Sequence, residues 1–303
     1  MISNLTPEQI AEIVEFGEAE AQLSFGLYAP PEFARPFRLA AKRIGSLRLL
    51  MIPELDTPFF NRILGLGIGS PASESMLDEA IGFFQDAGCT NYMAQVSPMA
   101  QPAECPQWLI DRGLLPSSNW AKMVRGDDPA PVMPTDLRLE SIGKDQADDF
   151  ASLVLTTFEI PGVLRPLMKC SVGQPGWHSY LAFDGDKPVS VASIFINGEV
   201  GWLGNMGTLK QYRRHGAQGA LFARCIQDGL ALGCKWFITE TGEDKPEDPN
   251  PSYHNMLRSG FQLTYLRRNY VHRESASPVK LTRRALFVAA YTLKFAWQRL
   301  WVR

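Results

Sequence analysis

Hydrophobic residues recur at every third or fourth position in two segments of the second half of the chain, 145–157 and 216–232. This spacing puts the apolar residues on one face of a helix and predicts two amphipathic helices. Between them lie three mostly apolar segments, 179–186, 190–198 and 199–208, which end at glycine, aspartate or the next polar turn. They predict three strands of an antiparallel meander.

The pattern after the second helix predicts a strand, a short helix and a last strand, at 234–240, 251–259 and 261–271. A similar order occurs earlier in the chain, where Cys89 follows a helix end and precedes an apolar strand, as Cys234 does later. Because both regions share one order of elements, the chain is expected to contain one α/β unit twice.

Proline and polar residues are concentrated at 125–142, between two regions of regular hydrophobic pattern. Such a composition is typical of a linker. We therefore predict a first domain at 1–126, a linker at 127–137 and a second domain at 138–274. The first domain should begin with a capped helix, because Thr6 is placed as an N-cap before a proline and, three positions on, a glutamine.

The composition is that of a globular protein: 45% of the 303 residues are hydrophobic, 20% are charged, and the net charge is -2. This balance excludes a disordered chain and does not favour a nucleic-acid partner. The five cysteines include no C-x-x-C pair, so neither a disulfide framework nor a metal site is predicted. The N-terminus lacks the basic and apolar regions of a secretory signal, which together with the cysteines indicates a cytoplasmic protein.

A cationic turn, Arg213–Arg214–His215, lies directly before the predicted helix at 216–232. A helix N-terminus carries unsatisfied N–H groups and partial positive charge, so it is a natural seat for an anion. Gly216 and Gly219 would let a ligand approach the backbone closely. Neither a G-x-x-x-x-G-K-[ST] loop nor a G-x-G-x-x-G fingerprint is present, which excludes two common nucleotide-binding motifs.

A strand, the Arg-x-x-Gly turn, a helix and a further strand, followed by NPSYHNMLRSGF, resemble the GNAT acyltransferase superfamily over residues 136–273. The resemblance implies an α/β fold of the α+β type, with two GNAT-like mixed, mostly antiparallel sheets flanked by helices. It also implies acetyl-CoA as co-substrate, with the pyrophosphate on the turn. The turn departs from the family's Q/R-x-x-G-x-G/A motif at Gln218, where a small residue is expected. The implied acetyl-CoA-binding residues are Met206, Gly207, Thr208, Arg213, Arg214, His215, Gly216, Ala217, Gln218, Gly219, Ala220, Asn250 and Ser252.

For the transfer step, the resemblance implies direct attack of an amine on acetyl-CoA in a ternary complex. Many GNAT enzymes place a tyrosine, as the acid, at the position that is Met256 here, and Tyr253 is the substitute one helical turn earlier. Glu240 is the candidate base because it ends a predicted strand beside the cleft; the alternative is an ordinary surface carboxylate. Glu159 and His254 are further candidates, and deprotonation through water needs no single base. The acceptor is expected to be a small-molecule or peptide amine, and the alternative function is a non-catalytic CoA-binding or scaffold protein.

The first half has glycines but no basic residues in the segment equivalent to the cationic turn. Glu74 and Asp78 place negative charge in the first turns of the helix that follows, which would repel phosphate. We therefore predict a degenerate GNAT-like domain at 1–126 that braces the second domain or shapes its acceptor pocket. The alternative is that it binds a different ligand.

The C-terminal segment 278–303 combines basic and aromatic residues and contains no acidic ones. It predicts an amphipathic helix that is too polar and slightly too short for a membrane span. Two alternatives stay open: peripheral binding at a membrane surface, or docking on the protein itself or on a second subunit. The sequence does not indicate an oligomeric state.

Overall fold

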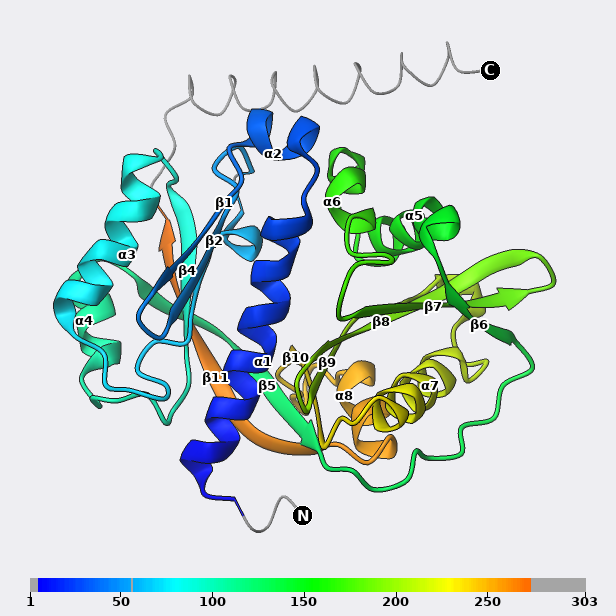
Figure 1. The fold of residues 1–303 in the computed structure, drawn as a ribbon. Helices are drawn as coiled ribbons and strands as arrows, with labels where there is room; N and C mark the ends of the chain where they lie inside the picture. Colours follow the sequence, from blue (N-terminus) through cyan, green and yellow to red (C-terminus); the bar gives the residue numbers. More distant parts are fainter. Residues whose placement is uncertain (1–4, 56, 274–303) are drawn as a thin grey trace.

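The computed structural model describes residues 5–55 and 57–273. The helix predicted at 278–303 lies outside the described residues. Among the residues that are described, no helix is both long and apolar enough to cross a membrane. Figure 1 shows a wide sheet with helices on both of its faces and one long helix, α1, across its middle.

The described strands form one mixed sheet of eleven strands in the order β1-β2-β3-β4-β11-β5-β10-β9-β8-β7-β6. The strands are β1 (Ala40–Ile44), β2 (Leu47–Met51), β3 (Arg62–Leu64), β4 (Asn91–Val96), β5 (Leu115–Arg125), β6 (Arg138–Ile142), β7 (Trp177–Asp184), β8 (Lys187–Asn197), β9 (Val200–Thr208), β10 (Trp236–Gly242) and β11 (Gln262–Arg273). Neighbouring strands are antiparallel except for β3 with β4 and β9 with β10. The mixed, mostly antiparallel α/β fold predicted from the sequence is confirmed, including the β7-β8-β9 meander.

The last strands of the two halves are exchanged. β5 ends the first half but pairs with β10 of the second, and β11 ends the second half but lies between β4 and β5. The two sheets expected from the sequence are one sheet in the structure, because each exchanged strand satisfies its backbone hydrogen bonds in the other half. The division into domains on either side of 127–137 stays a prediction; that segment contains no helix or strand and separates β5 from β6.

Helices cover both faces of the sheet (Figure 1). They are α1 (Pro7–Tyr28), α2 (Pro31–Phe37), α3 (Glu74–Asp86), α4 (Cys105–Asp111), α5 (Ala147–Thr157), α6 (Arg165–Lys169), α7 (Ala217–Ala231) and α8 (Pro251–Arg258), with short 3-10 turns η2 (Pro58–Phe60), η3 (Lys144–Gln146), η4 (Gly162–Leu164) and η5 (Lys210–Tyr212). α1 shares a hydrophobic core with α5 and α6, whereas α7 and α8 contribute to a second core and α3 and α4 to a third.

The helix α1 begins at the predicted cap. The Thr6 hydroxyl accepts a hydrogen bond from the Gln9 backbone N–H at 3.3 Å, and the Gln9 side chain accepts one from the Thr6 N–H at 2.9 Å. Further along, Gly17 lets the helix lie close to the sheet, because a Cβ there would stand 2.4 Å from Cδ1 of Ile238 on β10. A helix of the first half is therefore packed directly on a strand of the second.

Candidate active site

The sheet opens between β9 and β10. These parallel strands pair only over Val200–Trp202 and Trp236–Ile238. Beyond Ile238, β10 stays paired with β5 up to Gly242, while β9 continues along β8. β10 and β9 therefore separate and form the two sides of a wedge-shaped opening, with β10 held by β5 and β9 held by β8. Backbone and side chains of both strands are exposed in this wedge.

A bulge in β9 shapes one side of this wedge. Asn205 and Met206 stand in β9 where β8 has a single residue, Ala192. Asn205 adopts a φ of 54°, in the left-handed region that few residues other than glycine and asparagine occupy. Bulges bend a strand and redirect its side chains, and here both bulged residues line a cavity.

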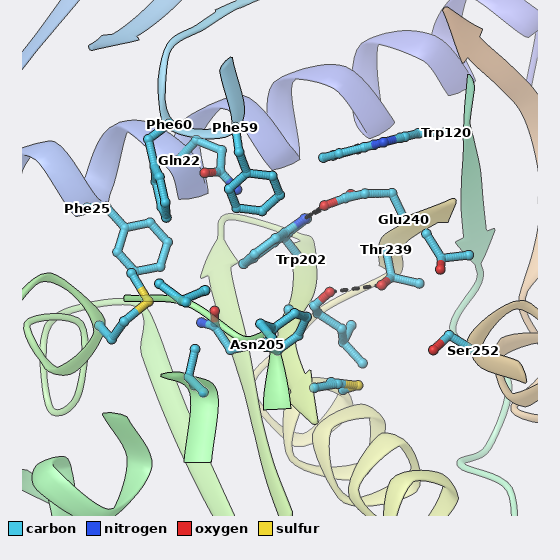
Figure 2. A pocket seen from close by; sticks show the side chains of 18 of the residues that line it. Gln22, Phe25, Phe59, Phe60, Trp120, Trp202, Asn205, Thr239, Glu240 and Ser252 are labelled. Atoms are coloured by element: carbon cyan, nitrogen blue, oxygen red, sulfur yellow. Dashed lines mark hydrogen bonds between the residues drawn. The ribbon is translucent and has the colours of Figure 1, made fainter. Parts of the chain in front are cut away.

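That cavity has a volume of about 330 Å3 and fills the wedge (Figure 2). This volume lies at the lower end of the usual range for small-molecule sites. The first half of the chain contributes lining residues from α1, β2, η2, β3 and β5, and the second half contributes the rest. The aromatic side chains of the lining are Phe25, Phe59, Phe60, Trp120, Phe158 and Trp202. The pocket therefore belongs to both halves, and aromatic side chains from both halves contribute to its walls.

Glu240 lies at this cavity and not on the surface, with a side chain only 10% exposed. It accepts hydrogen bonds from Lys122 Nζ at 2.9 Å and from Trp202 Nε1 at 3.1 Å. Burial and the negative charge of Glu18 raise the pKa of Glu240 above its ordinary value, against the opposing effect of Lys122. A carboxyl with a raised pKa holds a proton more tightly than an exposed one, which suits a group that takes a proton from an amine.

Behind Glu240 lies a buried ionic network that joins both halves. Glu18 on α1 accepts from Lys122 Nζ at 2.6 Å and from Arg267 Nη1 at 2.5 Å, and it is paired with Arg62 Nη1 at 3.3 Å. Burial alone would raise the pKa of Glu18, but Arg267 and Lys122 outweigh burial and hold it well below the usual range. Glu18 is therefore a carboxylate at neutral pH, and it fixes α1 to β3, β5 and β11.

Sequence reasoning missed this network and the cavity residues of the first half. One signal was present: Glu15 and Glu18 interrupt the face of α1 that buries Ala11, Val14 and Ala21. Two acidic residues three positions apart on a buried helical face require cationic partners. Which cations those are depended on strand pairings far apart along the chain, so the partners were not predictable from the spacing.

The cationic turn leads into the N-terminus of α7. Gly216 precedes α7 with a φ of 75°, and no side chain within residues 5–55 and 57–273 caps this helix. Arg213 Nε donates to the Thr208 carbonyl at 3.4 Å. The side chains of Arg214 and His215 are exposed and have no hydrogen-bond or ionic partner among the described residues. Uncapped N–H groups beside unpartnered cations are what an anion site requires.

The glycines of this turn also accommodate the linker. A Cβ on Gly216 would stand 2.3 Å from the carbonyl oxygen of Pro134, and one on Gly219 would contact Met133 at 3.4 Å. The Thr135 hydroxyl donates to the His215 carbonyl at 2.8 Å. The sequence predicted that a ligand would approach the backbone closely at Gly216, but in the structure the carbonyl of Pro134 does so. The positive φ of Gly216 also sets the direction in which α7 begins.

The helix α8 closes the cavity on the side of α7. Asn250 caps it: Oδ1 accepts from the Ser252 N–H at 3.0 Å, and Nδ2 donates to Thr241 Oγ1 at 3.0 Å. Ser252 and Met256 line the cavity, whereas Tyr253 packs against the core beneath α7 and is not in the lining. The amide of Asn250 is therefore used within the protein, and the α8 hydroxyl that faces the cavity is that of Ser252 (Figure 2).

Of the other residues predicted to bind acetyl-CoA, some line the cavity and others are engaged within the protein. Met206 and Gln218 line the cavity, and Gln218 accepts a hydrogen bond from Asn255. Gly207 faces α5, since a Cβ there would stand 2.1 Å from Thr157 Oγ1. Thr208 bonds Ser190 at 2.8 Å. Ala217 and Ala220 are buried in the core beneath α7.

The two further acid or base candidates lie on the surface. The side chain of Glu159 is 77% exposed and pairs with Lys210 at 3.3 Å. The side chain of His254 is 46% exposed and lies 3.3 Å from Asp244. Neither is in the lining of the cavity. The structure therefore brings Glu240, Met206, Gln218 and Ser252 together around one space and leaves Glu159 and His254 outside it.

Residues 148–261 match the acetyltransferase (GNAT) family. The match covers less than half of the 303 residues and spans the chain from α5 to just beyond the end of α8. The sequence matches no curated protein. The whole architecture is nevertheless similar to solved structures: a GCN5-related N-acetyltransferase from Kribbella flavida has a TM-score of 0.61 and 17% identity, with 87% of this chain and 97% of that chain covered.

Two further structures share the arrangement. A tandem GNAT protein from the clavulanic acid biosynthesis pathway has a TM-score of 0.56 and 16% identity, with 88% of this chain and 96% of that chain covered. A GCN5-related N-acetyltransferase from Sphaerobacter thermophilus has a TM-score of 0.55 and 14% identity, with 88% and 93% covered. At these identities the likeness concerns the fold. The GNAT domain itself supports an acyltransferase, and the opening between β9 and β10 lies inside the matched residues.

Proposed function

We propose that this protein is an N-acetyltransferase that transfers an acetyl group from acetyl-CoA to an amine bound in the same cavity. The observation that carries the proposal is the wedge between β9 and β10. It runs from Gln218 at the first turn of α7 to Glu240 on the α1 side of the sheet. One continuous space thus lies between the first turn of α7, the helix that follows the cationic turn, and a buried carboxylate.

The residues around α7 fit the diphosphate of acetyl-CoA. The N–H groups of residues 217–219 have no side-chain cap, and Arg213, Arg214 and His215 supply charge and donors around them. The equivalent helix of the first half differs in both respects. Ser73 caps α3 by accepting from the Met76 N–H at 3.2 Å, and the first turns of α3 are acidic. These contrasts support one acetyl-CoA site per chain, in the second half.

In the transfer, the amine nitrogen forms a bond to the acetyl carbon, the carbon–sulfur bond breaks, and the thiolate of CoA takes up a proton. The bulge at Asn205 and Met206 presents strand backbone to the thioester carbonyl, where N–H groups stabilise developing negative charge. Glu240 accepts the proton that the amine loses, directly or through water. Tyr253 stays a candidate for protonating the thiolate, and Ser252 is a second hydroxyl of α8 that lines the cavity.

One observation favours a second function, acetyl-CoA binding without transfer. The position at which the family places its acidic tyrosine is Met256, which is 5% exposed and lines the cavity. A thioether cannot donate a proton to the leaving thiolate. The two functions differ in turnover and share the cofactor site.

Thermal unfolding and thiol release test both functions together. Acetyl-CoA should raise the unfolding midpoint, and amines should then release free CoA thiol at a rate above hydrolysis. Stabilisation without thiol release from any amine would favour the binding protein, and absence of stabilisation would refute both functions.

A double variant of the cationic turn tests the proposed diphosphate site. Replacing Arg213 and Arg214 by alanine should weaken acetyl-CoA binding by at least about 10-fold, because charge-assisted hydrogen bonds to the phosphates are lost. A matched control replaces Lys42 and Arg43, two adjacent exposed cations on the edge strand β1. Equal acetyl-CoA affinity in both double variants would show that the diphosphate is bound elsewhere.

A further inference from the structure

Arg62 on β3 lines the cavity and yet is only 2% exposed. Its guanidinium lies against two neighbouring aromatic rings, 4.5 Å from the centroid of Phe59 and 5.1 Å from that of Trp120, and the two ring centroids are 6.1 Å apart. Its Nε donates to the Phe59 carbonyl at 2.6 Å. The two rings and this hydrogen bond hold the guanidinium in one orientation.

The charge of Arg62 is the least compensated of the buried cations that share Glu18. Lys122 and Arg267 bind Glu18 at 2.6 Å and 2.5 Å, and each also binds a second carboxylate. Arg62 reaches Glu18 only through Nη1, at 3.3 Å, and has no other carboxylate partner among residues 5–55 and 57–273. Its Nη2 makes no hydrogen bond within the part of the chain that the structure describes.

A fixed guanidinium with an unused nitrogen at a cavity wall is a binding group for a small anion. Arginine recognises a carboxylate through two parallel N–H···O bonds, and such bonds are strong where water is excluded. Beside Arg62 the lining is formed by the rings of Phe59 and Trp120, which limit the access of water to this wall of the cavity. The anion that binds here must therefore be carried on a molecule that also has an apolar surface.

Two more polar groups of the lining restrict the ligand. Glu240 offers a carboxylate to an amine, and the side-chain amide of Gln22 has no hydrogen-bond partner within the described residues. Figure 2 shows Gln22 on α1 and Glu240 on β10 around one space, with Phe59 and Trp202 between them and Phe25 and Phe60 on the far side of Gln22. The cavity thus combines a cation, a carboxylate and an apolar wall, which are the complements of a carboxylate, an amine and an apolar side chain.

We propose that the amine acceptor is an amino acid with a bulky apolar or aromatic side chain, and that Arg62 binds its carboxylate. This inference rests on the proposed acetyl transfer and names the substrate class for it. The volume agrees: an apolar cavity of roughly 150 Å3 holds benzene, so about 330 Å3 accommodates a ring together with an amino acid backbone. Arg62 belongs to the first half, which thereby sets the specificity of a reaction carried out by the second.

The first test compares acceptors that differ only in the carboxylate. Phenylalanine should be acetylated with a kcat/KM about 10- to 100-fold higher than phenethylamine, because a charge-assisted pair is lost with the carboxylate. Alanine and serine should be poorer acceptors than phenylalanine and leucine. Equal kcat/KM for phenylalanine and phenethylamine would overturn the inference and leave the proposed acetyl transfer intact.

The second test uses Arg62→Gln, which removes the charge and retains a donor. We expect the ratio of kcat/KM for phenylalanine over phenethylamine to fall towards one, mainly through KM for phenylalanine. The matched control is Arg112→Gln, since Arg112 is an arginine of the first half with two carboxylate partners and lies outside the cavity lining. An unchanged ratio in Arg62→Gln would refute the role of Arg62. A merely structural defect would lower both acceptors together and so would also count against it.

Binding of the reaction product to the wild-type protein tests carboxylate recognition without requiring turnover or a sequence variant. Trp120 and Trp202 line the cavity, so their fluorescence reports its occupancy in the wild-type protein. N-acetylphenylalanine should bind the wild type at least about 10-fold more tightly than N-acetylphenethylamine. Absence of that preference would overturn the inference even if acetyl transfer occurs, whereas the preference without any thiol release would support Arg62 as a carboxylate-binding residue and refute both the transfer and the role of the amino acid as its acceptor.

Discussion

The buried ionic network around Glu18 leads us to expect a large loss in the free energy of unfolding when Glu18 is neutralised. Glu18 is fully buried and is the shared carboxylate of Lys122, Arg267 and Arg62. The change Glu18→Gln preserves the size of the side chain and removes its charge. Three buried cations then share the charges of Glu15 and Glu240 alone, and Arg62 loses its carboxylate partner.

The magnitude follows from the cost of leaving a buried charge without its partner, which is about 3–5 kcal/mol. A domain of ordinary stability unfolds with roughly 5–15 kcal/mol, so the variant should lose at least about a fifth of its stability. The control is Glu79→Gln, since Glu79 is 54% exposed and pairs with Lys42 on the surface. An exposed pair of this kind contributes about 0–1 kcal/mol.

Urea unfolding followed by tryptophan fluorescence and by far-ultraviolet circular dichroism measures the effect. Glu18→Gln should shift the midpoint strongly at neutral pH, and Glu79→Gln should leave it nearly unchanged. The sign of the pH dependence provides a second check. Because the pKa of Glu18 is held below its unfolded value of 4.5, its stabilisation is present above that pH and is lost as the pH falls. A loss of less than about 1 kcal/mol in Glu18→Gln would refute the reasoning that the network secures α1 to the sheet.

Two further predictions concern the site. Burial and Glu18 raise the pKa of Glu240 above 4.5, with Lys122 opposing them, so kcat/KM should rise with pH through that higher value. Glu240→Gln should remove this rise from the pH profile of kcat/KM. If the rise persists in the variant, Glu240 is not the base. Gly207→Ala should destabilise the protein by about 1–3 kcal/mol, because its Cβ would stand 2.1 Å from Thr157 Oγ1. The control Gly82→Ala in α3, where a Cβ would have nothing within 4 Å, should stabilise the protein slightly. Equal thermal unfolding midpoints for the two variants would contradict this packing argument.

Local patterns in the sequence predicted most of the secondary structure of the second half, but not the strand β6 or the short helix α6. The helix at α7, the meander β7-β8-β9 and the short helix α8 all follow from periodicity and from glycine, proline and asparagine at the element ends. The cap of α1 was also predictable, because Thr6 and Gln9 act within one turn. The cationic turn was visible for the same reason, since its basic residues are neighbours along the chain.

The candidate site was predictable only in its local part. Arg213, Arg214 and Gln218 could be named from one motif, and Glu240 from the end of one strand. The environment of Glu240 could not, because its partner Lys122 is 118 positions away and reaches it through the exchange of β5. Tyr253 and Met256 show the limit of spacing: which of them lines the cavity depended on how α8 is rotated, and Met256 does.

By itself, the sequence determined the order of helices and strands, a helix start suited to an anion, and the resemblance to an acetyltransferase. These features depend on residues within a few turns of one another. Only the tertiary structure decided that β5 and β11 are exchanged, that both halves line one cavity, and that Arg62 is buried there with an unused nitrogen. The physical reason is that strand pairing and charge compensation act between residues brought together by the fold, such as Tyr265 and Glu15, 250 positions apart and joined at 2.7 Å.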